Sequence, residues 1–148
     1  MGKQFEEAKK LAANPKVVAA VKASNSNPEG KIMTQEKWAA AAVLDPAIRS
    51  FQKNDAAEEI KKWKGEAVSE AFLNNASGTK VAFLNKTSNW SHKGKPKHED
   101  PMAGKDWTGK VEVDESTGTQ QIQIAVPVMD GGKAIGSLVV GLAVSKLK

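Results

Sequence analysis

The chain opens with apolar residues at helical spacing, which predicts helical structure as far as Ser24. The apolar positions of this stretch are Phe5, Ala8, Leu11, Ala12, Val17, Val18 and Val21. Asn14 followed by Pro15 is typical of a helix cap with proline at the first helical position. The stretch is therefore either one long kinked helix or two helices in sequence. We expect a buried stripe formed by Ala8, Leu11, Val18 and Val21.

Three shorter helices are predicted between the first stretch and residue 67. Their expected caps are Thr34, Asp45 and Asp55. Their inward-facing residues are expected to be Trp38, Ala41, Ala42, Ile48, Phe51, Ile60 and Trp63. Because Trp38 and Trp63 lie on these apolar stripes, we assign both tryptophans to the core.

From Val68 the apolar residues alternate with polar ones, which predicts strands. The predicted strands are Ala71–Asn74, Lys80–Asn85, Lys110–Asp114, Thr119–Met129 and Ala134–Val144. Tight turns are expected at 76–78 and 130–132, and Thr87–Thr108 is interpreted as one long loop. The fourth strand has a fully apolar face, made by Ile122, Ile124, Val126 and Val128. The last strand is apolar on both faces, so we expect it at the centre of the sheet.

Helices followed by strands indicate an α+β fold with an antiparallel sheet. We expect a single domain over residues 1–148, mainly helical in 1–67 and sheet in 68–148. A chain of 148 residues can bury a core without disulfides, and no apolar run is long enough to span a membrane.

Composition favours a binding domain over a catalyst. The chain has no cysteine and only two histidines, and it lacks the glycine-rich phosphate loops and the nucleophile elbow of common enzyme classes. The net charge is +5, but 21 of the 22 basic residues are lysine and only Arg49 is arginine. Since specific base readout favours arginine, we expect no specific nucleic-acid partner. The first residues lack the apolar core of a signal peptide, so the protein is either cytosolic or exported by a signal outside this chain.

Three stretches of the sequence resemble a known family. They are Ala8–Val21, Val81–Trp90 and Asp114–Asp130, the last continued by the return Gly132-Lys-Ala-Ile-Gly136. In this order and spacing they are similar to a single Cache domain, the PAS-like, PDC-type sensor fold found outside the cytoplasm. The strand end Pro127-Val128 followed by the Gly132–Gly136 return is the most specific element.

The resemblance implies a long N-terminal helix packed on a five-stranded antiparallel sheet, with a small-molecule pocket on the other face. It implies ligand sensing in signal transduction or chemoreception, without catalysis or cofactor, in a periplasmic or otherwise extracytoplasmic location. The stretch Ser91–His98 is basic where many relatives are acidic and aromatic, so a relative's ligand does not transfer. The alternative is an interaction or dimerisation module on the same fold, with a second copy docking along the first helix.

We expect a small polar or anionic metabolite to bind between the long loop and the sheet. The candidate ligand-binding residues are Lys86, Thr87, Ser88, Trp90, Asp106, Trp107 and Gln123. Trp90 and Trp107 either wall the pocket or fold the loop onto the sheet. Lys86, Thr87 and Ser88 either hold a polar ligand or close a strand-end turn.

Asp106 either binds an amine or caps a short turn. Gln123 reaches into a pocket if its face of the strand is covered, and is a surface residue otherwise. His92 and His98 lie six residues apart in a lysine-rich stretch. This spacing does not favour a metal site, so we expect surface histidines and no metal.

Overall fold

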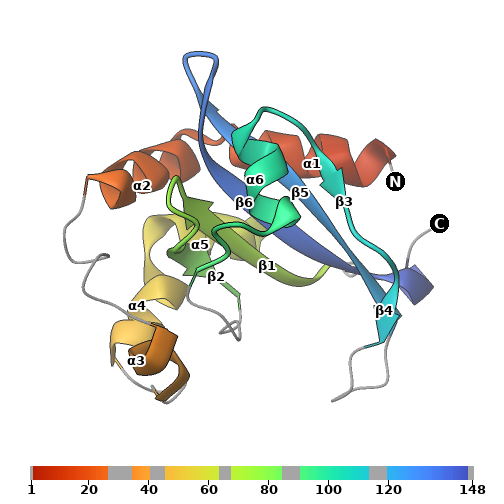
Figure 1. Ribbon diagram of the computed structural model, residues 1–148, viewed down its shortest axis with the longest axis horizontal. Coiled ribbons are helices and arrows are strands. Elements are labelled where there is room, and N and C mark those ends of the chain that lie inside the picture. Colours follow the sequence, from red (N-terminus) through yellow and green to blue (C-terminus); the bar gives the residue numbers. More distant parts are fainter. Residues whose placement is uncertain are drawn as a thin grey trace.

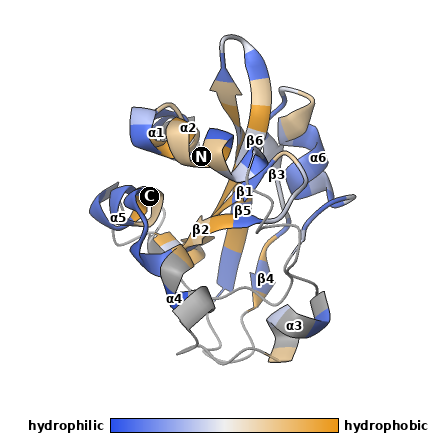
Figure 2. Cartoon of the chain, turned by 90° about the vertical axis from the view of Figure 1, so that its left-hand side faces the viewer, coloured by the Kyte–Doolittle hydropathy of each residue, from blue (hydrophilic) through white to orange (hydrophobic). Residues whose placement is uncertain are grey.

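An antiparallel sheet lies between two layers of helices (Figures 1 and 2). The computed structural model describes residues 2–26, 35–40, 46–63, 68–84, 91–113 and 120–146. Helices α1 (Gly2–Ala12), α2 (Pro15–Asn25) and α5 (Asp55–Trp63) cover one face of the sheet, which we call the α1 face. Helix α6 (Pro96–Met102) covers part of the opposite face, which we call the α6 face. No helix within the described residues has the length and apolar character needed to cross a membrane.

The N-terminal stretch forms two helices rather than one. Asn14 separates α1 from α2, and its side-chain oxygen accepts a hydrogen bond from the backbone N–H of Lys16 at 2.8 Å. The buried stripe differs by one residue from the prediction, because Val17 is fully buried whereas Val18 is only partly buried. Ala8, Leu11 and Val21 are buried as predicted.

Two further helices, α3 (Gln35–Ala40) and α4 (Pro46–Lys53), precede α5. The cap of α5 is Asn54 rather than the predicted Asp55, since the Asn54 side chain accepts from the backbone N–H of Ala57 at 2.8 Å. Trp38 is fully buried, as predicted. Trp63 is only partly buried against the core of the α1 face, where its indole donates to the Glu7 carbonyl at 3.1 Å. The predicted positions that lie outside the described residues are Thr34, Ala41, Ala42 and Asp45.

The sheet has the order β2-β1-β6-β5-β3, with β4 also pairing with β5. Its strands are β1 (Val68–Asn75), β2 (Lys80–Phe83), β3 (Trp107–Thr108), β4 (Glu112–Val113), β5 (Gln120–Asp130) and β6 (Lys133–Ala143). The last strand therefore lies at the centre, as predicted. Gly131 and Gly132 join β5 to β6 with φ values of +60° and +83°, which is the geometry of a tight hairpin turn and favours glycine.

The predicted loop Thr87–Thr108 contains regular structure, so that prediction was wrong in its second half. Pro96 begins α6, and β3 pairs with β5 at Trp107 and Thr108. The sequence pattern did not predict α6 because this helix has no apolar stripe. Its buried residues are His98 and Pro101, so its contact with the sheet depends on a histidine and a proline.

Each face of the sheet has its own core. The α1 face buries aliphatic side chains, including the predicted apolar face of β5. The α6 face buries a cluster that we call the aromatic cluster, consisting of Trp38, Phe72, Phe83, Ala125 and Val139. Between this cluster and α6, the same face carries buried polar side chains, and these form the candidate site.

Candidate functional site

A chain of hydrogen bonds crosses the α6 face from β2 to α6. Lys80 donates to Asn74 Oδ1 at 2.9 Å, and Asn74 Nδ2 donates to Ser137 Oγ at 2.9 Å. Ser137 Oγ lies 2.7 Å from His98 Nδ1, and His98 Nε2 lies 3.2 Å from the Ala76 carbonyl oxygen. Because a carbonyl only accepts, His98 donates from Nε2 and accepts the Ser137 hydroxyl at Nδ1. All four side chains are almost fully buried.

Three basic side chains surround one aromatic ring. The His92 imidazole stacks on the Phe72 ring with centroids 4.8 Å apart, and Lys80 Nζ lies 4.8 Å from the same ring centroid. Lys97 Nζ, from α6, lies 6.0 Å from it. Lys80 Nζ also approaches His92 Nδ1 at 2.5 Å. The negative face of the ring attracts the cations, but the three groups repel one another wherever they are charged.

Burial and mutual repulsion lower the pKa values of these bases. Burial, followed by the charge of Lys97, lowers the pKa of Lys80 to about 7. Burial, followed by the charge of Lys80, lowers the pKa of His92 to about 3. Burial also lowers the pKa values of Lys97 and His98. The site is therefore a place where added negative charge would be favourable.

Gln123 lies on a covered face of β5 beside these basic side chains, and its role in ligand binding stays a prediction. Its side-chain oxygen accepts from Lys97 Nζ at 3.1 Å, and its Nε2 donates to Glu70 Oε1 at 2.6 Å. Glu70 raises the pKa of Lys97 against the larger effect of burial. Gln123 thus lies between the Glu70 carboxylate and Lys97 Nζ and is hydrogen-bonded to both.

The other predicted residues divide into three groups. Trp107 is partly buried against the aromatic cluster on the α6 face, and Gly109 leaves space for its indole ring. Asp106, its neighbour in sequence, instead forms an ion pair with Lys9 of α1 at 2.8 Å. Lys86, Thr87, Ser88 and Trp90 lie outside the described residues.

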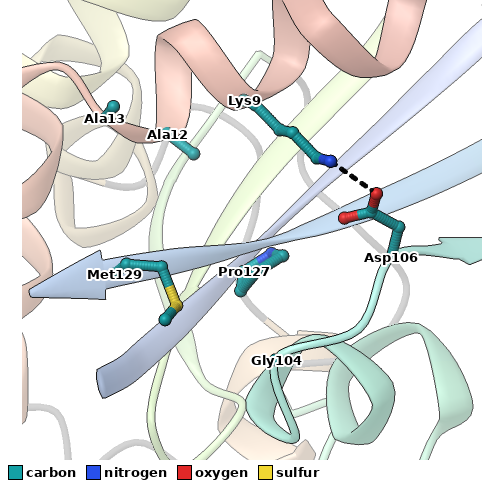
Figure 3. Close-up of a pocket in the computed structure, with 7 residues that line it drawn as sticks. All are labelled: Lys9, Ala12, Ala13, Gly104, Asp106, Pro127 and Met129. Carbon is teal, nitrogen blue, oxygen red and sulfur yellow. Dashed lines mark ion pairs between the residues drawn. The ribbon is translucent and has the colours of Figure 1, made fainter. Parts of the chain in front are cut away.

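Asp106 lines a cavity of about 330 Å³ between α1 and β5 (Figure 3). The cavity is bounded by Lys9, Ala12, Ala13, Gly104, Asp106, Pro127 and Met129. Figure 3 shows Lys9 extending from α1 toward Asp106, with Pro127 and Met129 on the strand beneath. The structure thus separates Asp106 from the basic residues around Phe72.

Sequence reasoning missed the two histidines and both lysines of the site. His92 and His98 are 4% and 1% exposed, so the expectation of surface histidines was wrong. His92 is followed directly by three exposed residues, Lys93, Gly94 and Lys95. Their hydrophilic character led to the expectation that the whole stretch lies on the surface. A usable signal was Lys80, which begins a strand whose other residues are all apolar. Among the described residues, no group of three or more potential metal ligands occurs.

Comparison with solved structures finds similar folds. The first is the sensor domain of the V. cholerae histidine kinase DctB, with a TM-score of 0.54 and 14% sequence identity. The match covers 97% of this chain and 50% of that domain, so the chain spans half the length of its relative. No protein-family model matches the sequence, and no curated protein matches it significantly.

Two chemoreceptor structures are also similar, at lower scores. The ligand-binding domain of the Pseudomonas aeruginosa chemoreceptor PctC, in complex with GABA, has a TM-score of 0.45 at 17% identity over 97% of this chain and 61% of that one. The sensory domain of the Campylobacter jejuni chemoreceptor Tlp3, with isoleucine bound, scores 0.49 at 14% identity over 96% and 58%. At 14% identity, the match to the DctB sensor domain establishes the architecture alone. The chain has the fold of the DctB sensor domain, the Cache-type fold that its sequence resembles.

Proposed function

We propose that this chain is a small-molecule-binding sensor domain of Cache type, a single domain over residues 1–148 that acts outside the cytoplasm without catalysis. The fold of the DctB sensor domain supports the class of function. The ligand is a small polar or anionic metabolite bound on the α6 face. There it contacts Gln123 and Trp107, together with Lys86, Thr87, Ser88 and Trp90, whose contribution stays a prediction.

The observation that carries this proposal is the gathering of Lys80, His92 and Lys97 around Phe72. If this face had only a structural role, apolar side chains could cover the Phe72 ring, and no ionisable group would have to be buried there. A ligand carboxylate would favour the charged forms of Lys80 and Lys97, whose pKa values burial lowers, and would accept hydrogen bonds from them. Phe72 and Trp107 supply apolar contact beside them.

A thermal shift screen tests the proposal, because a ligand that binds the folded state stabilises it by mass action. The panel pairs small carboxylates with their uncharged amides. We expect at least one carboxylate to raise Tm and its amide to have little effect. Lys97→Met should remove most of the shift, whereas Lys93→Met, at an exposed position in the same segment, should keep it. Folded protein that responds to no member of the panel would contradict the proposal.

The location is tested separately by fractionating the native cells with an antibody to this chain. Recovery with extracytoplasmic markers is expected, and recovery only with cytoplasmic markers would overturn it. The dimerisation alternative has less support, since the buried apolar side chains of α1 and α2 face the sheet.

A further inference from the structure

The cavity beside α1 is separate from the proposed ligand site. It lies at an edge of the sheet, because no strand among the described residues pairs with the outer side of β5 beyond Ala125. Helix α1 closes this edge on one side, and the connection from α6 to β3 closes it on the other. Its volume, about 330 Å³, falls within the range of small-molecule sites.

The lining combines one ion pair with apolar walls. Lys9 and Asp106 are its charged residues, and the remaining side chains are alanine, proline and methionine. Gly104 contributes space, since a Cβ built on it would meet no atom within 4 Å. Two acidic residues outside the lining have partners of their own, since Glu7 pairs with Lys10 and Asp130 pairs with Lys22. Asp106 is therefore the acidic group that a molecule in this cavity would meet.

The Lys9 side chain shows which chemistry suits Asp106. Its end is a primary alkylammonium group, held 2.8 Å from the carboxylate and leading from an apolar stem. Lys9 is 54% exposed and Asp106 is 34% exposed, so the ammonium can return to water more easily than the carboxylate can. Exposed ion pairs contribute little to stability. Exchanging the Lys9 ammonium for another ammonium on Asp106 therefore costs little free energy. An anion at the same place would be repelled by Asp106.

We propose that this cavity binds a small primary alkylamine, whose ammonium replaces that of Lys9 on Asp106. The apolar body of the amine lies against Pro127 and Met129, and Ala12 and Ala13 leave the room for it. This site is independent of the proposed anion site on the α6 face. Either one can be present without the other.

Isobutylamine is a suitable probe, with isobutyrate and isobutanol as controls of the same shape and different charge. For a ligand of five heavy atoms, we expect a dissociation constant on the order of 1 mM. Titration followed by backbone amide NMR should shift the signals of Gly104, Asp106 and Met129 with the amine. The carboxylate and the alcohol should leave these signals in place.

Three variants decide the assignment. Asp106→Asn should abolish binding, because it keeps the shape and removes the charge. Lys9→Met should bind the amine several-fold more tightly, because it removes the internal competitor, an effect that a purely structural Lys9 would not produce. Asp130→Asn, which breaks the comparable exposed pair with Lys22, should bind as the wild type does. Absence of cavity shifts with isobutylamine, unchanged binding by Asp106→Asn, or weaker binding by Lys9→Met would each overturn the proposal.

Discussion

Glu70 and Gln123 are hydrogen-bonded at 2.6 Å although their strands are not neighbours in the sheet. Strand β6 lies between them, and its residue at this level, Gly141, is paired with both Glu70 and Gln123. A Cβ on Gly141 would come within 2.5 Å of Glu70 Cγ. The missing side chain of Gly141 is what allows two polar side chains to meet across the central strand.

Gly141→Ala should therefore break this contact. We expect a loss of about 1–2 kcal/mol in the free energy of unfolding, since Glu70 must move and Gln123 loses a partner. Urea denaturation of the variant and of the double variant Gly141→Ala, Glu70→Ala measures the effect. The second substitution removes the clash, so the double variant should recover part of the lost stability. A loss in the double variant as large as the two single losses added together would contradict the explanation.

The two adjacent valines of α2 should differ sharply when charged. Val17 is fully buried in the core of the α1 face, whereas Val18 only packs against its margin. We expect Val17→Asp to cost more than about 3 kcal/mol and Val18→Asp about 1 kcal/mol. Thermal unfolding compares them directly, and similar losses in Tm would show that the helix is rotated from the described position.

Acid should weaken the protein through His92. Its pKa is about 3 when folded, against an ordinary value of 6.5, so the unfolded chain binds this proton more readily. Stability should consequently fall as the pH drops through the window from 6.5 toward 3. His98, whose pKa is also lowered, adds to the same trend.

His92→Phe keeps a ring against Phe72 and removes the titration. Between about pH 6.5 and pH 5, before most carboxylates titrate, this variant should lose stability less steeply than the wild type. Lys93→Met serves as the control and should retain the wild-type slope. A slope in His92→Phe that matches the wild type would rule out His92 as a source.

Base should have the opposite effect through Lys80. Its pKa of about 7 lies below the ordinary 10.5, so between these values the unfolded chain carries a proton that the folded chain has released. Stability should rise as the pH increases from 7 toward 10.5. Lys80→Met should flatten this rise, to which Lys97 contributes in the same direction because its pKa is also lowered by burial. Urea denaturation at several pH values measures it, and an unchanged rise in the variant would refute the assignment.

The fold was predictable where local pattern determines structure. The alternation in β5 assigned Ile124 and Val126 to one face, and the doubly apolar last strand indicated the central position. Helix α6 was not predictable in this way. Its burial depends on His98 meeting Ser137 of β6, a contact across 39 residues that no local period encodes.

The candidate site was predictable only in part for a related reason. Gln123 could be placed from its strand alone, because alternation gives the face. The grouping of Lys80 and Phe72 depends on how β1 and β2 are aligned, and their register shifts between Leu73 and Asn74. A shift of this kind changes which side chains share a face, and it leaves no mark in the spacing of apolar residues.

The central place of β6 also has a kinetic consequence. Among the described strands, β1 and β5 are joined only through β6, which follows both of them in sequence (Figure 1). Until β6 has formed, the sheet consists of two separate parts, and the backbone N–H and C=O groups on the inner edges of β1 and β5 have no strand to pair with. Closure must wait for contacts that are distant in sequence, which are slow to form. A nascent or truncated chain that ends before Lys133 therefore exposes two open strand edges, and such edges invite pairing between chains.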